Sequence, residues 1–473
     1  MQLSKINWLN EVEKRKDDLL KDTQNLLHIK SLLDEENTFP DAPLGKGVKE
    51  ALDFMLTLGE KDGFIPKNVG NLAGHLEFGE GEELLGILCH VDVVPEGDGW
   101  ASDPFAAEIR EGKIFARGAI DDKGPTMAAY YAMKIVKDLG LPVNKRIRMI
   151  IGTDEESDWR CVDHYFEKEE MPTLGFAPDA DFPIINAEKG IADMDIVQKL
   201  PDEEVGKGNI EVLSFTSGKR YNMVPDHATV TLNIIGNQMD VVQRFTNFMK
   251  QHQLEHQSHV DNGELTLEVK GVSAHGMEPK KGINAGLFLG EFLSKLDLNP
   301  SASDYFKFIS RYFFNDSRGV SLGVSYSDEV SGELTINPGK LSYSRQSGGS
   351  IGLTCRYPVT NKIDDTKKKL DDLLEVNGFV INKFKDTKPH YVDENEFLIQ
   401  TLKKVYEEQT GEKSYLIAIG GGTYARSLKS GVAFGPLFPG RPDIAHQKDE
   451  YIEIDDLLKA TAIYAQAIYE LTK

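Results

Sequence analysis

Apolar and polar residues in the first part of the chain are spaced as in two buried strands separated by a helix. Leu84 to Cys89 is a short apolar run that ends abruptly in polar residues and predicts a buried strand, and Arg146 to Ile151 is predicted as the next strand. Between them, Pro125 to Leu139 has helical spacing, with the proline suited to the first turn and Gly140 to the end. A strand, a helix and a strand of these lengths predict an α/β unit with parallel strands.

Other elements follow from the same periodicities. Helical spacing predicts further helices over Leu3 to Ile29, Val48 to Leu58, Met239 to His252, Ala285 to Leu296 and Ile454 to Leu471. Alternating apolar and polar residues predict strands with one solvated face at Ala228 to Ile235 and Leu265 to Val269. Short apolar segments that restore the α/β pattern near the C-terminus are Tyr415 to Ile419 and Val432 to Phe434.

The α/β pattern of strands and helices gives way near Gly190 to alternating strands with helices between them, and it returns after Thr387. The simplest account is one α/β domain built from both ends of the chain, residues 1–190 and 388–473, with an α+β domain, residues 191–387, inserted between them. A chain of 473 residues is long enough for two such domains.

Composition excludes some classes of binding partner and indicates the cellular compartment. Lysine and arginine number 54 against 76 acidic residues, a net charge of −22, which repels nucleic acid and anionic membranes. No stretch approaches the roughly 20 apolar residues of a membrane span. Residues 1–18 mix apolar and charged positions, so we expect no signal peptide. Three cysteines in so long a chain do not make a disulfide framework, and together these features predict a cytoplasmic protein.

Acids and histidines fall where predicted strands end, which is where ligands bind in open α/β sheets. His90 and Asp92 directly follow the strand Leu84 to Cys89 and point the same way along an extended chain. A metal-bound histidine usually donates its other ring N–H to a carboxylate, so the two fit a ligand and its orienting partner. The alternative is an ordinary loop histidine and aspartate. Cys89 points the other way, and we expect it to pack in the core.

Two further acidic clusters have similar positions. Asp121 and Asp122 precede the helix that starts near Pro125; a carboxylate there can bridge two cations, or it can simply cap the helix. Glu155 and Glu156 follow Asp154 at the end of the strand Arg146 to Ile151, and adjacent acids repel one another unless a cation or proton relieves them. One of these glutamates could bind metal while the other takes a proton from metal-bound water. The alternative is a solvated turn.

Asp179 and His446 complete a candidate ligand set, although each alone is unremarkable. Together the set contains two imidazoles and three carboxylates: His90, Asp121, Glu156, Asp179 and His446. Mixed nitrogen and oxygen donors of this kind suit two Zn²⁺ ions, with Mn²⁺ or Co²⁺ as possible substitutes. Five ligands, one of them bridging, leave room for a shared water.

These motifs resemble those of the zinc aminoacylase, carboxypeptidase G and peptidase T family of metallopeptidases. The resemblance rests on Cys89 to Pro95, Gly118 to Gly124, Thr153 to Glu156 and Ala177 to Asp179, in this order, together with His446. It extends over nearly the whole chain and is closest to the bacterial carnosinase-like dipeptidases of lactic acid bacteria. It implies a catalytic domain with a mixed, mainly parallel sheet flanked by helices, and an inserted lid domain.

The resemblance also implies roles for individual residues. His90 and Asp179 would hold one zinc, Glu156 and His446 the other, and Asp121, two residues before Lys123, would bridge them. Glu155 would be the general base, and Asp92 would orient His90.

In the inserted domain, Ser273-Ala274-His275-Gly276 resembles the lid motif, whose histidine stabilises the tetrahedral intermediate. Asn222 and Arg356 resemble residues that contact the carboxylate end of the substrate; the alternatives are a turn asparagine and a strand-edge salt bridge. Gly421 and Gly422 lie in a glycine run that lacks a P-loop ending and would let backbone approach the substrate.

The resulting hypothesis is a di-zinc peptidase that hydrolyses unblocked dipeptides with a metal-bridging water activated by Glu155. The enlarged lid implies a monomer whose partner is a small peptide. Two alternatives stay open: a deacylase of N-acyl or N-succinyl amino acids with the same fold, and a catalytically inactive metal-binding protein. A serine or cysteine hydrolase is not expected, and the three cysteines have no recognisable catalytic setting.

Overall fold

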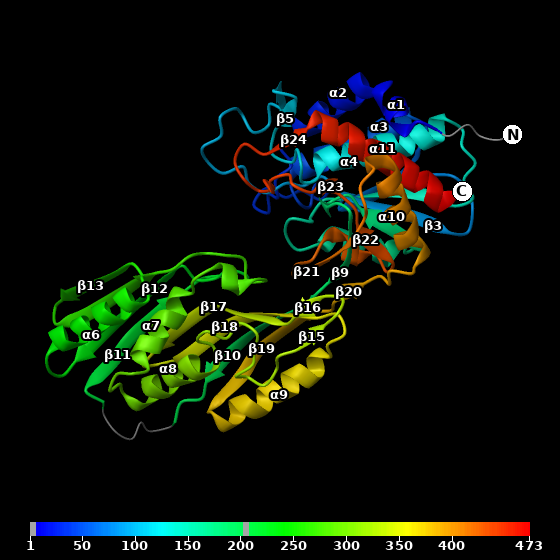
Figure 1. Cartoon of the computed structure of the whole chain (residues 1–473). Coiled ribbons are helices and arrows are strands. Elements are labelled where there is room, and N and C mark those ends of the chain that lie inside the picture. The colour runs from blue at the N-terminus through cyan, green and yellow to red at the C-terminus, as the bar shows by residue number, and fades with distance from the viewer. Residues whose placement is uncertain (1–5, 202–207) are drawn as a thin grey trace. The chain divides into compact units, whose positions relative to one another are not determined.

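The structure is a computed structural model that describes residues 6–201 and 208–473. Its internal contacts divide the chain into two compact units. Unit 1 comprises Met1–Ala187, Tyr391–Ile417 and Gly422–Lys473, and unit 2 comprises Glu188–His390 and Ala418–Gly421. Both ends of the chain therefore belong to unit 1 (Figure 1).

Unit 1 is built on a nine-stranded mixed sheet in the order β1-β2-β6-β3-β7-β22-β9-β20, with β21 paired to β9. Its strands are β1 (Ile65–Val69), β2 (Ala73–Phe78), β3 (Leu84–His90), β6 (Arg146–Gly152), β7 (Leu174–Ala177), β9 (Ile184–Glu188), β20 (His390–Tyr391), β21 (Leu416–Ile419) and β22 (Gly431–Ala433). Strand β3 is parallel to both β6 and β7, and β22 is parallel to β7, which confirms the predicted parallel unit. Strands β1 and β2 run antiparallel at one edge.

Both faces of the central strands are covered. Helices α4 and α11 pack against β3 and β6, and α3 packs against β1 and β2. Leu85 and Ile87 of β3 lie in this main core, whereas Gly86 between them faces Pro172 and Leu428 on the opposite side. Every residue of β3 is consequently buried, which explains why its sequence is continuously apolar rather than alternating.

The helices of unit 1 are α1 (Trp8–Glu13), α2 (Lys16–Leu27), α3 (Lys46–Lys61), α4 (Lys123–Asp138), α5 (Arg160–Lys168), α10 (Phe397–Thr410), α11 (Ile454–Thr472) and the short 3-10 helix η2 (Tyr424–Ser427). A separate three-stranded sheet holds β4 (Glu108–Arg110), β5 (Lys113–Phe115) and β24 (Tyr451–Glu453), and a two-stranded one holds β8 (Ala180–Asp181) and β23 (Pro436–Leu437). Strands β5 and β24 thereby tie the C-terminal segment to the chain just before α4.

The prediction of one helix from Leu3 to Ile29 is wrong. Leu3 lies outside the described residues, and the remainder forms two helices, α1 and α2, because Arg15 leaves the helical conformation with φ −115° and ψ 7°. Helix α1 packs against α11, where the Trp8 ring centroid lies 5.9 Å from that of Tyr469, whereas α2 packs against α4. The break lets the two apolar faces meet different helices.

Unit 2 contains an eight-stranded antiparallel sheet in the order β13-β14-β12-β11-β17-β18-β10-β19. Its strands are β10 (Gly190–Gln198), β11 (Ile210–Ser217), β12 (His227–Ile234), β13 (His256–Asp261), β14 (Glu264–Lys270), β17 (Thr335–Ser344), β18 (Gly348–Tyr357) and β19 (Phe379–Thr387). The helices are α6 (Gln238–Gln251), α7 (Ala285–Leu293), α8 (Pro300–Tyr312), α9 (Ile363–Val376) and the 3-10 turn η1 (Pro279–Lys281), and a small hairpin pairs β15 (Ser327–Asp328) with β16 (Gly332–Glu333).

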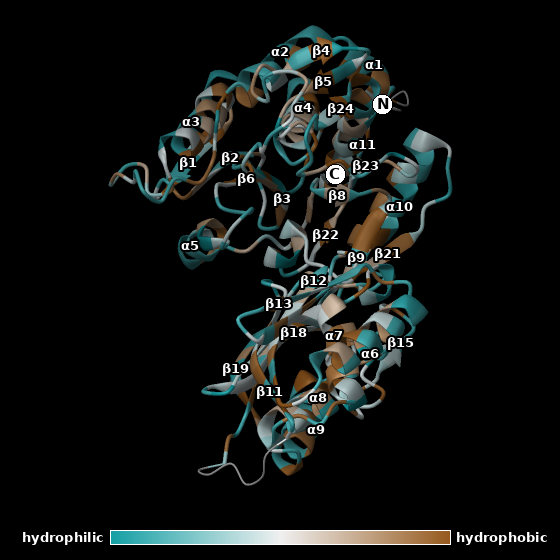
Figure 2. Ribbon diagram, turned by 90° about the vertical axis from the view of Figure 1, so that its left-hand side faces the viewer, coloured by the Kyte–Doolittle hydropathy of each residue, from teal (hydrophilic) through white to brown (hydrophobic). Residues whose placement is uncertain are grey.

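A single apolar cluster joins this sheet to its helices. Strands β12 and β14 alternate between buried and partly exposed residues, as the sequence predicted. Apolar and hydrophilic residues mix around the helices of both units, as expected where one side of a helix is buried (Figure 2). Among the described helices, none combines the length and the apolar character that spanning a membrane would require.

Candidate active site

The carboxyl ends of the central strands of unit 1 carry a cluster of ionisable side chains. His90 is the last residue of β3, Glu155 and Glu156 follow β6, and Asp179 follows β7. Because these three strands are parallel, their carboxyl ends lie at the same edge of the sheet. The structure gathers there the residues predicted as ligands and base: His90, Asp121, Glu155, Glu156, Asp179 and His446.

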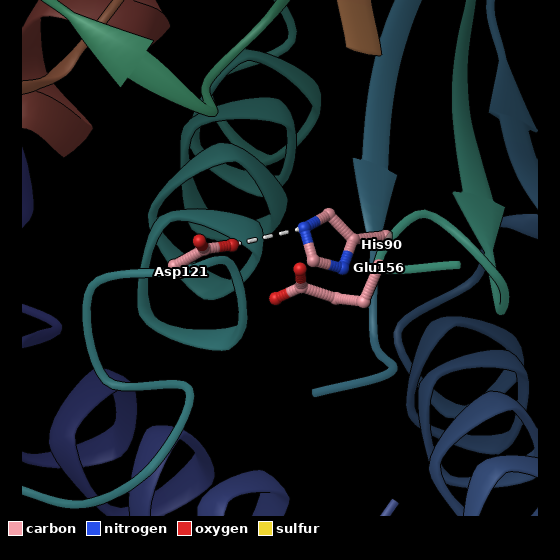
Figure 3. A group of neighbouring side chains, drawn as sticks. All are labelled: His90, Asp121 and Glu156. Carbon is pink, nitrogen blue, oxygen red and sulfur yellow. Dashed lines mark hydrogen bonds and ion pairs between the residues drawn. The ribbon is translucent and has the colours of Figure 1, made fainter. Parts of the chain in front are cut away.

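Asp121 lies in the loop just before α4, and its carboxylate faces the ring of His90 (Figure 3). Its Oδ1 lies 3.1 Å from Nε2 of His90, and its Oδ2 lies 2.9 Å from Nε2 of His446. The two oxygens of one carboxylate therefore face two different imidazoles. On the first side Asp179 Oδ2 lies 3.8 Å from His90 Nε2, and on the second Glu156 Oε1 lies 3.0 Å from His446 Nε2.

These separations fit metal ligation. Ligand atoms about 2.0–2.2 Å from a tetrahedral zinc ion lie roughly 3.3 Å from one another, within the range of the distances around Asp121. Ligand atoms of His90, Asp121 and Glu156 lie within 4.8 Å of one another, and so do those of His90, Glu155 and Asp179. Glu155 thus reaches the same cluster as the ligands.

Asp92 contacts both His90 and the loop that carries Glu156. Nδ1 of His90 lies 3.1 Å from the backbone carbonyl oxygen of Asp92 and 3.4 Å from its carboxylate Oδ1. Oδ2 of the same carboxylate accepts the backbone N–H of Glu156 at 3.0 Å. Asp92 therefore fixes the tautomer of His90 through its main chain and joins two ligand-bearing segments through its side chain.

The neighbouring acids are engaged in supporting contacts. Asp122 stands at the N-cap position of α4, but its carboxylate accepts the backbone N–H of His90 at 3.1 Å and the hydroxyl of Thr126 at 3.0 Å. Asp154 is 1% exposed and binds the Arg160 guanidinium through both carboxylate oxygens, at 2.7 and 2.9 Å. The run of three acids at Asp154 is consequently not a solvated turn.

Burial raises the pKa of the acids that surround Asp121. Removal from water raises the pKa of Asp179 to about 6 and that of Glu156 to about 7, and the nearby charge of Asp121 adds to both effects. The pKa of Glu155 is also held well above its ordinary value, first by burial. Burial opposes ionisation of Asp121 as well, but hydrogen bonds from His446 and His90 outweigh it and hold its pKa well below the usual range.

The two imidazoles respond to the same negative charge. Hydrogen bonds to Asp121 and Glu156 raise the pKa of His446 to about 11. Burial lowers the pKa of His90, but Asp121, Asp179 and Asp92 together hold it well above its ordinary value. Besides burial, neighbouring carboxylates raise the pKa of Asp179, of Glu156 and of both histidines, so the cluster contains excess negative charge, which divalent cations would neutralise. The donors and their charge therefore fit a pair of such cations.

Unit 2 brings together the other predicted site residues. The backbone N–H of Gly276 donates to the carbonyl oxygen of Asn222 at 2.7 Å, and His275 forms a β-bridge with Met223, so His275 and Asn222 lie side by side. Burial and then the charge of Arg356 lower the pKa of His275, which favours a neutral imidazole.

The glycine run contributes to both units. Arg356 is 5% exposed and donates from Nη1 to the carbonyl oxygen of Gly420 at 3.3 Å, directly beside Gly421. Gly421 belongs to unit 2 and Gly422 to unit 1. A Cβ at Gly422 would collide with Nη1 of Arg426, so the end of the Arg426 side chain would have to shift to admit a larger residue.

Some residues around the site had no predicted role. Tyr424 is fully buried, its ring centroid lies 5.9 Å from that of His90, and its hydroxyl lies 3.1 Å from Sγ of Cys161. Arg117 and Glu450 form a buried ion pair next to Asp121 and His446. Only proximity in sequence to the motifs could have drawn attention to these side chains, because their partners are distant along the chain.

An α/β sheet whose carboxyl edge gathers two imidazoles and two further acids around the shared carboxylate of Asp121 is typical of a metallohydrolase. The chain belongs to the peptidase family M20/M25/M40, whose family model matches residues 86–470. It is therefore a peptide-bond hydrolase, as its sequence predicted.

Relatives and solved structures agree with this assignment. A Bacillus subtilis (strain 168) protein named "Putative dipeptidase YtjP" is 55% identical over 469 residues, covering 99% of this chain and 100% of its own length. A Staphylococcus epidermidis (strain ATCC 12228 / FDA PCI 1200) protein with the name "Putative dipeptidase" is 47% identical over 98% of this chain and 99% of its own.

Among solved structures, human carnosine dipeptidase 1 superposes with a TM-score of 0.58 at 14% identity, covering 98% of each chain. Aminoacylhistidine dipeptidase from Vibrio alginolyticus gives a TM-score of 0.58 at 13% identity, covering 96% of each chain. At these identities the two structures show that the fold is shared.

Proposed function

We propose that this peptidase is a two-metal dipeptidase that hydrolyses unblocked dipeptides. The observation that carries the proposal is the central carboxylate of Asp121, with one oxygen 3.1 Å from His90 and the other 2.9 Å from His446. A carboxylate placed in this way can bridge two cations, each of which has one further imidazole and one further carboxylate.

His90 and Asp179 would hold one cation, and Glu156 and His446 the other. The mixed nitrogen and oxygen donors favour Zn²⁺, with Mn²⁺ or Co²⁺ as substitutes. When bound, such a pair lowers the pKa of water and polarises a carbonyl oxygen. The excess negative charge of the cluster, which raises the pKa of His446 through Asp121 and Glu156, supports binding of more than one cation.

Glu155 is the proposed general base. Its carboxylate takes a proton from the attacking water and passes it to the leaving amine nitrogen. Burial raises the pKa of Glu155, and a carboxylate with a raised pKa accepts a proton more readily than an ordinary one. Asp92 keeps the Nδ1 side of His90 occupied, so that Nε2 faces Asp121 and Asp179.

The residues of unit 2 are proposed to bind the substrate. His275 would donate a ring N–H to the oxyanion of the tetrahedral intermediate, which a neutral imidazole can do. Asn222 and Arg356 would bind the carboxylate end of the dipeptide, and the backbone at Gly421 and Gly422 would lie along the substrate. Their grouping around the Gly276–Asn222 hydrogen bond and the Arg356–Gly420 hydrogen bond supports a shared task.

Dipeptides are the proposed substrates because the similar proteins of Bacillus and Staphylococcus are named dipeptidases. We also propose that the protein acts as a cytoplasmic monomer. The net charge of −22 and three buried thiols, Cys89, Cys161 and Cys355, fit that compartment.

A substrate panel with metal analysis tests the proposal. Free dipeptides, free tripeptides, and N-acetyl and N-succinyl amino acids are assayed in parallel, before and after treatment with a chelator and again after adding Zn²⁺. We expect the highest kcat/KM for free dipeptides, loss of activity with chelator, recovery with Zn²⁺, and two metal ions per chain. Preference for the acylated amino acids would identify a deacylase instead, and two bound metals without turnover of any substrate would identify an inactive relative.

A further inference from the structure

Unit 1 contains a buried ion pair that touches several of the loops carrying the proposed ligands. Nη1 of Arg117 lies 2.5 Å from Oε2 of Glu450, and the side chains are 2% and 0% exposed. The two residues are 333 positions apart in the sequence. An ion pair so completely removed from water is costly to build unless its remaining hydrogen-bonding groups also find partners.

Glu450 contacts the loop of the bridging carboxylate. Its second carboxylate oxygen, Oε1, accepts the backbone N–H of Ile120 at 2.9 Å and that of Asp121 at 3.3 Å. These two bonds hold the main chain at the residue whose side chain faces both imidazoles. The position of the Asp121 carboxylate therefore depends on Glu450.

Arg117 contacts two more segments through its other terminal nitrogen. Nη2 lies within hydrogen-bond distance of three backbone carbonyl oxygens: His446 at 3.2 Å, Glu96 at 3.3 Å and Pro95 at 3.4 Å. The guanidinium also lies 5.3 Å from the centroid of the Trp100 ring. One side chain thus joins the segment that follows Asp92 to the loop that carries His446.

We propose that Arg117 and Glu450 are a positioning pair that assembles the second half of the metal centre, formed by Asp121, Glu156 and His446. The inference rests on the proposed function, since it assumes that these residues bind a cation. Three segments distant in sequence meet at this pair: the one after β3, the one before α4 and the one before β24. Removing the pair weakens the attachment of the His446 loop to the other two segments, where the Ala101–Asp449 hydrogen bond and the pairing of β24 with β5 remain.

The effect should be larger for the second cation than for the first. His90 is held by strand β3, whereas His446 lies in a loop at φ +63° with a side chain that is 50% exposed. The carbonyl of His446 is tied to the rest of the site through Arg117. A purely structural ion pair would instead change overall stability and leave the affinities for both cations alone.

The test compares Glu450→Gln with a matched control, Glu77→Gln. Glutamine keeps the shape of Glu450 and can still accept from the Asp121 loop, but it leaves Arg117 without its counter-charge. Glu77 pairs with Arg148 at 2.6 Å in the same unit, with side chains 16% and 6% exposed, away from the ligands. Metal-free wild type and both variants are titrated with Zn²⁺ in competition with a chromophoric chelator, and thermal unfolding is recorded for each.

We expect two Zn²⁺ ions per chain in the wild type. In Glu450→Gln the second ion should bind about 10- to 100-fold more weakly, the range typical of residues that support metal ligands, and the first ion should be affected less. Glu77→Gln should lower the Tm without altering either affinity. Added Zn²⁺ should restore kcat in Glu450→Gln, because its ligands are intact and only their placement has loosened.

A second variant, Arg117→Lys, keeps the charge but loses the planar fork that reaches Glu450 and the carbonyl oxygens together. It should also weaken the second ion, and a wild-type profile in both site variants would overturn the inference. An equal loss in Glu77→Gln would overturn it too. A wild-type chain that binds fewer than two Zn²⁺ ions would instead refute the proposed metal centre, an outcome distinct from the failure of the positioning role.

Discussion

The two halves of the candidate metal centre use the same chemistry but are built in different ways. Each has an imidazole about 3 Å from one oxygen of Asp121, at 3.1 Å for His90 and 2.9 Å for His446. His90 has no exposed surface, ends the central strand β3 and has its backbone N–H bound by Asp122. His446 is 50% exposed and lies in a loop at φ +63°.

The difference indicates that one half is part of the sheet and the other is added by a loop. Residues held by a buried strand need little further support, whereas a ligand on an exposed loop depends on contacts from outside it. We therefore expect the half that contains His90 to keep its metal ion under perturbations that remove the ion from the half that contains His446. The following predictions test that inequality, from the largest expected effect to the smallest.

The largest effect should come from Glu155, which is the proposed general base and, in that proposal, a ligand of neither cation. Glu155→Gln removes the proton acceptor, so kcat should fall by about 10²- to 10⁴-fold, the usual contribution of general acid–base catalysis. Both metal ions should remain, because the ligands are intact. Steady-state kinetics and metal analysis on the same sample measure the two quantities, and normal turnover in the variant would remove Glu155 from the mechanism.

Replacing each imidazole separately compares the two halves directly. His90→Ala should lower the free energy of unfolding of the metal-free protein by about 3–5 kcal/mol, because it leaves buried carboxylates without their positive partner. His446→Ala should cost less than about 1 kcal/mol, since its side chain is half exposed. Urea unfolding with chelator present provides both values.

The same two variants should differ in metal content. His446→Ala should keep one Zn²⁺ per chain, held by the half that contains His90. Equal stability losses in the two variants, or loss of both ions from His446→Ala, would show that the halves are not independent.

Asp92 connects the halves and should have a smaller effect. It contacts Nδ1 of His90 and accepts the backbone N–H of Glu156 at 3.0 Å. Asp92→Asn should weaken binding of both ions by about 10- to 100-fold. Chelator competition measures the affinities. Loss confined to one ion would mean that Asp92 supports a single half.

The smallest effect concerns His75, which lies outside both halves. It shows how a buried histidine behaves when burial and nearby positive charges outweigh the effect of a carboxylate. His75 is 4% exposed and thus almost as deeply buried as His90. In contrast to that of His90, its pKa is lowered, to about 3, first by burial and then by the charges of Arg148 and Lys67. Below about pH 6.5 His75 therefore binds a proton in the unfolded chain but stays neutral in the folded protein. The stability contributed by neutral His75 is complete above about pH 6.5 and is lost as the pH falls toward 3.

Between pH 6.5 and 5.5 this amounts to about 1 kcal/mol. The difference in unfolding free energy between the wild type and His75→Gln, measured with chelator at each pH, should shrink by that amount over this interval. A difference that does not change with pH would show that His75 titrates normally in the folded protein.

Strong periodicity made much of the fold predictable. Helix α4, strands β3 and β6, and helix α11 have the predicted types, with ends within two residues of those expected. The edge hairpin of β1 and β2 was missed because Ile65–Val69 has few apolar residues and includes a proline. The helix predicted from Leu3 to Ile29 failed for another reason: its apolar faces had to meet two different helices, α11 and α4.

The candidate site was predictable to the extent that its residues stand at strand ends or in recognisable motifs. His90, Asp121, Glu155 and Asp179 were found in this way, and the structure gathers them at one edge of the sheet. His446 is remote from the others in the sequence, and it could be predicted as a ligand only together with the other four candidate ligands.

The supporting residues other than Asp92 were not predictable. Arg117 and Glu450 are 333 positions apart, and Arg160 is one of many arginines that could have paired with Asp154. No local sequence pattern indicates which charged residues, distant along the chain, will form a buried ion pair.

The sequence by itself determined the chemical inventory and the strands that present it, because hydrophobic periodicity and residue type are local properties. Tertiary structure alone decided which oxygen of Asp121 faces which imidazole, and which acids serve as supports rather than ligands. Those choices depend on distances of a few ångströms between segments hundreds of residues apart, and only the packed sheet and its loops establish such distances.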